Sequence, residues 1–141
     1  VTDVGPNYSK VRSIIDDSSN VSAMVLTTKD NFNVSGSLMN MNKDKVLPFS
    51  ELRDENDKVQ QGDPVVTSYV SDQYQQGLLI GYIYSVEDNA NNLTKSGYIT
   101  PVVDFQHLQD VLVITEIKNT GKEDISSSKS SSTESENSTQ N

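Results

Sequence analysis

Two short apolar blocks near the end of the apolar part of the chain place the strongest constraint on its fold. They cover residues 102–105 and 111–114, and the one apolar residue between them is Leu108, three positions after Phe105. This spacing predicts a strand, one helical turn and a second strand. Asp104 can cap the turn, because a carboxylate accepts from backbone N–H groups two or three residues on. Apolar residues on both faces of 111–114 predict a strand buried on both sides, as in the last strand of a small barrel.

The rest of the apolar part shows alternating apolar residues separated by turn signals. Gly5-Pro6-Asn7 is a turn, since Pro fixes φ and both Gly and Asn tolerate positive φ. Pro64 belongs at a strand start or an edge because it has no N–H to donate. The predicted strands are residues 1–4, 11–15, 21–25, 33–39, 45–49, 64–67, 78–86 and 95–103. The pattern predicts an all-β fold.

Composition excludes several classes of function. Residues 1–117 carry 8 basic and 16 acidic side chains, and no basic cluster is present. Nucleic acid and anionic lipid are therefore not expected partners, since both need a basic face. There are no cysteines, and the acidic loops at 54–57 and 87–92 lack the spacing of a twelve-residue calcium loop. No cofactor or metal is predicted.

The last 24 residues differ from the rest of the chain. Residues 118–141 hold eight serines, no aromatic residue and one large aliphatic residue, Ile125. Such a segment cannot bury enough apolar area to offset its ordering entropy, so we predict a disordered tail. No run of apolar residues is long enough to span a membrane. Because the chain opens on Val1 inside an expected strand, we expect it to be a fragment of a longer protein.

Four segments carry a resemblance to a known family. The closing run at 101–113 resembles the closing motif of the rod shape-determining protein MreC. Residues 62–68, Gly-Asp-Pro-Val-Val-Thr-Ser, resemble the family's Gly-Asp-x-Val-Val-Thr-Ser element, and residues 77–83 resemble the glycine-bracketed strand that follows it. The first eleven residues resemble a strand and turn of the family's first barrel. The resemblance runs in the family's order from residue 1 to residue 114.

This resemblance implies two small β-barrels, the first incomplete, followed by the disordered Ser/Thr-rich tail. Residues 1–30 would be later strands of the first barrel, residues 31–117 the second barrel, and 118–141 the tail. The family's coiled coil and its membrane helix would precede Val1. Any contact with the membrane would then pass through that missing helix, on the extracytoplasmic face of the cell membrane.

The resemblance further implies a non-enzymatic scaffold of the cell-wall elongation machinery. It would maintain cell shape by organising peptidoglycan synthesis proteins. The implied partners are MreD, a penicillin-binding transpeptidase and a second copy of the protein.

Two sets of residues are candidates for function. His107 is the only histidine, with Asp104 and Asp110 three residues to either side, so a serine hydrolase using His107 is the alternative hypothesis. No Gly-x-Ser-x-Gly motif accompanies it, and an exposed histidine at a corner is the plainer interpretation. The candidate partner-binding residues are tyrosines, which are enriched in interface hot spots: Tyr69, Tyr74, Tyr82 and Tyr84.

Overall fold

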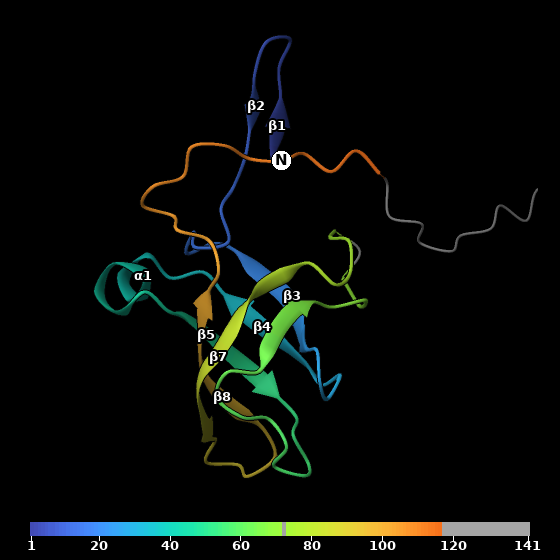
Figure 1. Cartoon of the computed structure of the whole chain (residues 1–141), viewed down its shortest axis with the longest axis vertical. Helices are drawn as coiled ribbons and strands as arrows, with labels where there is room; N and C mark the ends of the chain where they lie inside the picture. The colour runs from blue at the N-terminus through green and yellow to red at the C-terminus, as the bar shows by residue number, and fades with distance from the viewer. Residues whose placement is uncertain (72, 117–141) are drawn as a thin grey trace, which may run out of the picture.

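A closed β-barrel with a projecting hairpin forms the molecule in the computed structural model, which describes residues 1–71 and 73–116 (Figure 1). The hairpin is a two-stranded sheet of β1 (Asp3–Val4) and β2 (Ser9–Lys10). The barrel strands are β3 (Asn20–Val25), β4 (Asn31–Ser35), β5 (Leu47–Leu52), β6 (Pro64–Thr67), β7 (Leu79–Asp88) and β8 (Lys95–Pro101). Their order around the barrel is β3-β4-β5-β8-β7-β6, and β6 pairs with β3 to close it.

Every second side chain of a strand points into the barrel, because successive residues of a strand point to opposite faces. In β3, Val21, Ala23 and Val25 are buried. They meet Phe32 and Val34 of the neighbouring strand β4 in the same core cluster. The all-β prediction is confirmed, and so is the placement of Pro64 at the start of a strand.

The expected boundary between residues 30 and 31 falls inside this barrel. Strand β3 pairs with β4 through five residue pairs and with β6 through three, so it is part of the same closed sheet as the later strands. The barrel therefore starts at Asn20. The assignment of the residues before β3 to another barrel stays a prediction.

The predicted closing strand at residues 111–114 is wrong. Strand β8 ends at Pro101 and no described residue after it is in a strand. All four apolar side chains are exposed, Leu112 to 98% and Val113 to 68%. The physical reason is that every barrel strand already has a neighbour on each side, so this barrel offers no edge to a seventh strand.

The corner before this segment agrees better with the sequence. Residues 105 and 106 form a turn, and Asp104 Oδ1 accepts a hydrogen bond from the Gln106 N–H at 3.1 Å. Phe105 is partly buried and packs against the barrel core, whereas Leu108 is exposed. Of the predicted apolar pair Phe105 and Leu108, only Phe105 therefore packs against the barrel core.

Residues 11–15, expected to form a strand, are not in a strand, and residues 14 and 15 instead form a hydrogen-bonded turn below the hairpin. Ser19 Oγ donates to the Ser13 carbonyl at 2.8 Å, and the Asp16 N–H donates to the same carbonyl at 3.2 Å. Ile14 and Ile15 are partly buried against the barrel core. Side-chain hydrogen bonds of Ser and Asp offer the backbone this alternative to a sheet ladder.

The expected strand at 33–39 is shorter and gives way to a helix, α1 (Leu38–Asp44). Ser37 caps it by accepting from the Asn40 N–H, and Asp17 Oδ1 accepts from the Leu38 N–H at 2.9 Å. Met41 is its buried residue, and Lys45 ends it in the left-handed conformation. Across the described ranges no helix has the length and apolar run needed to cross a bilayer.

Gly97 allows the two longest strands to approach closely. A Cβ at this position would lie 2.0 Å from the Ser85 carbonyl oxygen and 3.1 Å from Phe49 Cε1. We expect Gly97→Ala to push β7 and β8 apart and to lower the free energy of unfolding by about 1–3 kcal/mol. Urea titration measures this, with Thr100→Ala at an exposed position of β8 as the control, expected to cost under ~1 kcal/mol. Equal midpoints for the two variants would contradict the close packing.

Candidate functional site

An uncharged tyrosine face covers the outside of the barrel on β5, β6, β7 and β8. It consists of Tyr82, Tyr84, Tyr98, Pro48 and Pro64. Tyr82 is directly opposite Pro64 on β6, and Tyr98 is opposite Pro48 on β5. Directly opposed residues share one side of a sheet. The three tyrosine residues are 39% to 53% exposed, so this side faces outward.

A bulge shapes this face. The register between β7 and β8 shifts after Ile83, which pairs with Ile99, so that the next pair is Ser85 with Tyr98. Tyr84 is the extra residue, and a bulge of this kind re-aims a side chain. Ile83 and Ile99 remain buried on the inner side. Tyr84, next to the inward-facing Ile83, faces outward, and the bulge places Ser85 instead of Tyr84 opposite Tyr98.

The other two predicted tyrosines lie on the loop between β6 and β7. Tyr69 is 58% exposed and Tyr74 is 38% exposed. Thr67 closes the base of the loop, since its hydroxyl donates to the Gln75 carbonyl at 2.5 Å and accepts from the Leu78 N–H at 2.9 Å. The structure thus divides the four predicted residues between the tyrosine face and this loop.

Ser68 fixes the same loop to the barrel. Its hydroxyl is fully buried and donates to Asn31 Oδ1 at 2.5 Å, while accepting from the Val70 N–H at 3.2 Å. The Thr-Ser pair of the Gly-Asp-x-Val-Val-Thr-Ser element therefore has a structural explanation. The two hydroxyls provide hydrogen-bond partners for backbone and side-chain groups where the chain leaves strand β6.

His107 lies on the surface beside Asp104. Its Nδ1 is 2.7 Å from Asp104 Oδ2, and the two side chains are 78% and 66% exposed. Two hydrogen bonds lower the pKa of the Asp104 carboxyl. The larger effect comes from His107 and a smaller one from the Gln106 N–H. Among the described hydrogen bonds, no serine hydroxyl reaches the imidazole. This arrangement is that of an exposed hydrogen-bonded pair at a corner.

Sequence reasoning missed a buried carboxylate at the opposite end of the strands. Asp54 has a side chain only 2% exposed, and its oxygens accept from the Lys58 N–H at 3.0 Å and the Val59 N–H at 2.9 Å. The Lys95 ammonium lies 3.9 Å away and also pairs with Asp57 and Asp88. In the sequence Asp54 and Asp57 lie more than 30 positions before Asp88 and Lys95, so no local signal marks the cluster.

This cluster makes the fold sensitive to pH. Burial raises the pKa of the Asp54 carboxyl, but the Val59 and Lys58 N–H groups and the Lys95 charge together outweigh it, and the pKa lies below its ordinary value. A carboxyl whose pKa is lowered on folding stabilises the folded state at pH values above its ordinary pKa. This stability is lost as the pH falls through the pKa of the folded state. The described residues contain no group of three side chains placed to hold a metal.

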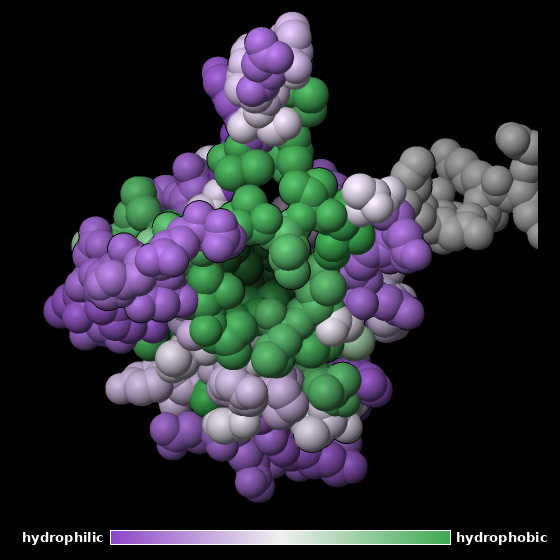
Figure 2. Space-filling model, turned by 45° about the horizontal axis from the view of Figure 1, so that its top comes forward, coloured by the Kyte–Doolittle hydropathy of each residue, from purple (hydrophilic) through white to green (hydrophobic). Residues whose placement is uncertain are grey.

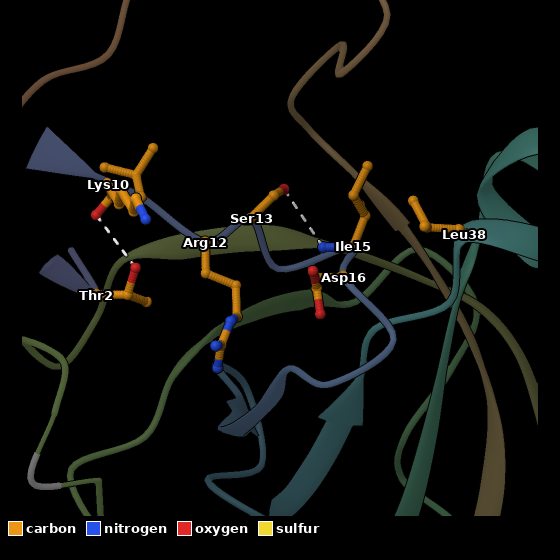
Figure 3. A pocket seen from close by; sticks show the side chains of 8 residues that line it. Thr2, Lys10, Arg12, Ser13, Ile15, Asp16 and Leu38 are labelled. Carbon is orange, nitrogen blue, oxygen red and sulfur yellow. Dashed lines mark hydrogen bonds between the residues drawn. The ribbon is translucent and has the colours of Figure 1, made fainter.

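A cleft of about 440 Å³ lies between the hairpin, the turn below it and α1 (Figure 3). Lys10 and Arg12 supply its positive charge, and Val11, Ile15 and Leu38 supply its apolar lining. Asp16 also lines it, but its carboxylate accepts from the N–H and hydroxyl of Ser18. These hydrogen bonds lower the pKa of the Asp16 carboxyl, which Arg12 lowers further.

The cleft opens near an apolar surface. Seen from the hairpin end, apolar residues gather around a hollow below the hairpin (Figure 2). The segment after β8 crosses this end of the barrel (Figure 1). Both the hairpin and this segment carry exposed aliphatic side chains.

Comparison with known proteins places this geometry in one family. The family model described as "Rod shape-determining protein MreC, barrel core" matches residues 1–115. The cell shape-determining proteins MreC of Geobacillus stearothermophilus and of Bacillus subtilis (strain 168) are each 32% identical over 68 residues, which is 48% of this chain. This chain covers 23% of the length of either relative.

A solved structure agrees with the family model. MreC of Listeria monocytogenes is 28% identical and superposes with a TM-score of 0.54, over 63% of this chain and 41% of that one. The match to the barrel-core model covers most of the 141 residues, including the whole barrel. The chain therefore belongs to the MreC family of rod shape-determining proteins.

Proposed function

We propose that this chain is a non-enzymatic scaffold that maintains cell shape by binding and organising peptidoglycan synthesis proteins. The observation that carries the proposal is the tyrosine face on a rigid, closed barrel. Tyrosine contributes large contact area at low entropic cost and keeps a polar group for hydrogen bonding. A closed barrel holds such a face in one geometry because it has no free edge.

The character of the face supports a protein partner. Tyr82, Tyr84 and Tyr98 and the two prolines carry no charge in a chain of formal net charge −9. Interface centres are depleted in charged residues and enriched in tyrosine, whereas rims are polar. The overall acidity disfavours nucleic acid, which needs a basic footprint.

The proposal includes partners and a location. We infer that MreD and a penicillin-binding transpeptidase bind the protein on the extracytoplasmic face of the cell membrane, and that copies of the chain associate. The support is membership of the family together with the neutral tyrosine face. The chain covers 23% of the length of the two curated relatives, so these partners are proposed and not taken from the comparison.

Removing the aromatic rings of the face tests the proposal. We expect full-length protein carrying Tyr82→Ala and Tyr84→Ala to fail to restore rod shape in a bacterial strain lacking its own MreC. Loss of one tyrosine hot spot costs about 2 kcal/mol or more of binding free energy, so affinity should fall at least about 30-fold. Cell shape and protein level are scored together, so that lost binding is distinguished from lost protein.

The matched controls are exposed residues elsewhere. His107→Ala and Tyr8→Ala each remove an exposed ring outside the tyrosine face, and we expect both to restore rods. Rods from the double tyrosine variant at normal protein level would show that this face does not bind the partner. Round cells from His107→Ala at normal level would instead favour the hydrolase hypothesis.

A further inference from the structure

The cleft below the hairpin holds two positive charges that no described residue pairs. Within residues 1–71 and 73–116, neither the Lys10 ammonium nor the Arg12 guanidinium has a hydrogen bond or an ion pair, although Arg12 influences the carboxyl of Asp16. In Figure 3 the Arg12 side chain lies between Thr2 and Asp16 on the cleft wall. Arginine offers five donors in a planar fork that suits a carboxylate.

Beside these charges the lining is aliphatic. Val11 is 60% exposed and Leu38 is 44% exposed, with Ile15 partly buried behind them. A cleft of about 440 Å³ accepts a few side chains of a peptide rather than a folded element. Its chemistry therefore fits an acidic side chain followed by one or two aliphatic ones.

The same chain exposes a segment with this chemistry. Residues 110–116 read Asp-Val-Leu-Val-Ile-Thr-Glu, in which four exposed aliphatic side chains lie between two exposed acids. None of these residues lines the cleft of its own molecule. The Glu116 carbonyl instead accepts from Gln75 Nε2 at 3.2 Å, on the loop between β6 and β7.

We propose that the cleft of one molecule binds segment 110–116 of a second copy. A carboxylate of the segment pairs with Lys10 and Arg12, and the neighbouring aliphatic residues cover Val11, Ile15 and Leu38. The contact is heterologous, because cleft and segment are different surfaces of the same molecule. This inference rests on the self-association in the proposed function and identifies the surfaces that make it.

A synthetic peptide of residues 106–116 with a fluorescent label tests the cleft. We expect the full chain to bind it, with shifts of the Val11, Ser13 and Ile15 amides in NMR spectra. Arg12→Glu should weaken binding at least about tenfold, because a hydrogen bond to a charged group is lost and a like charge added. Arg53→Glu, which alters a cation away from this cleft, should leave the affinity unchanged.

A charge exchange between two variants tests association of the chain itself. One variant is Arg12→Glu, and the other is Asp110→Arg with Glu116→Arg. Each alone should remain monomeric in sedimentation at concentrations where the wild type associates. Mixed in equal amounts, the two should form complexes, since the unaltered cleft of the second variant can bind the unaltered acidic segment of the first. The basic segment of the second also suits the acidic cleft of the first.

Each outcome decides a different point. Wild-type association that Arg12→Glu leaves unchanged would overturn the cleft contact while leaving self-association in place. A wild type that stays monomeric, or a peptide with Asn and Gln for its acids that binds equally well, would overturn the inference. Neither result bears on the tyrosine face, which the cell-shape assay tests separately.

Discussion

Replacing Val34 by aspartate should unfold the chain. Val34 is fully buried on β4, opposite Val21 on one side and Phe49 on the other. An aspartate there would place an unpaired charge among aliphatic and aromatic side chains, at a cost of several kcal/mol. Since the whole stability of a domain is ~5–15 kcal/mol, this change removes most of it. Far-UV circular dichroism and a urea titration measure the loss.

The matched control is the same substitution at Val113. This position was expected to lie in a buried closing strand, but its side chain is 68% exposed. Val113→Asp should therefore change the free energy of unfolding by within about 0.5 kcal/mol. A large destabilisation by Val113→Asp would restore the predicted strand, and a folded Val34→Asp variant would contradict the barrel core.

Removing the buried carboxylate should give the second large effect. In Asp54→Ala, the Lys58 and Val59 N–H groups lose their acceptor and Lys95 loses one counter-charge. We expect the free energy of unfolding at neutral pH to fall by about 2–4 kcal/mol. Urea midpoints at several pH values measure this. The difference from wild type should shrink as pH falls through the lowered pKa of the Asp54 carboxyl.

Asp57→Ala is the control for charge alone. Asp57 also pairs with Lys95, yet its side chain is 83% exposed. Exposed pairs contribute little, so the change should cost under about 1 kcal/mol. Equal losses from the two variants, or a loss for Asp54→Ala that does not depend on pH, would show that the buried hydrogen bonds are not the cause.

The sequence by itself determined the strands with strong local signals. Residues 78–86 and 95–103 were predicted as strands, and β7 and β8 occupy these positions within two residues at each end. Pro64 at the start of β6 and the capped turn after Asp104 also agree with the structure. In each case alternation, or a residue with restricted backbone or hydrogen-bonding chemistry, carries the information locally.

Local patterns also produced the chief errors. Residues 111–114 have a strong apolar pattern. Such a pattern indicates that burial would be favourable, but it does not specify which strand would pair with the segment. The start of α1 is capped locally by Ser37, but its Leu38 N–H donates to Asp17, which lies 21 positions away in the sequence. Sequence reasoning named four of the exposed tyrosines by residue type, but not that Pro64 lies opposite Tyr82 and Pro48 opposite Tyr98.

Tertiary structure alone decided which strands are neighbours and which polar groups meet. Closure through β3 with β6 and β5 with β8 joins residues about 40 to 50 positions apart and leaves no edge for residues 111–114. The same closure brings Lys95 to Asp54, and the turn at 13–19 brings Arg12 beside α1 to form the cleft. Sequence periodicity reports which face of a strand is buried, whereas strand pairing depends on long-range hydrogen bonds that no local pattern records.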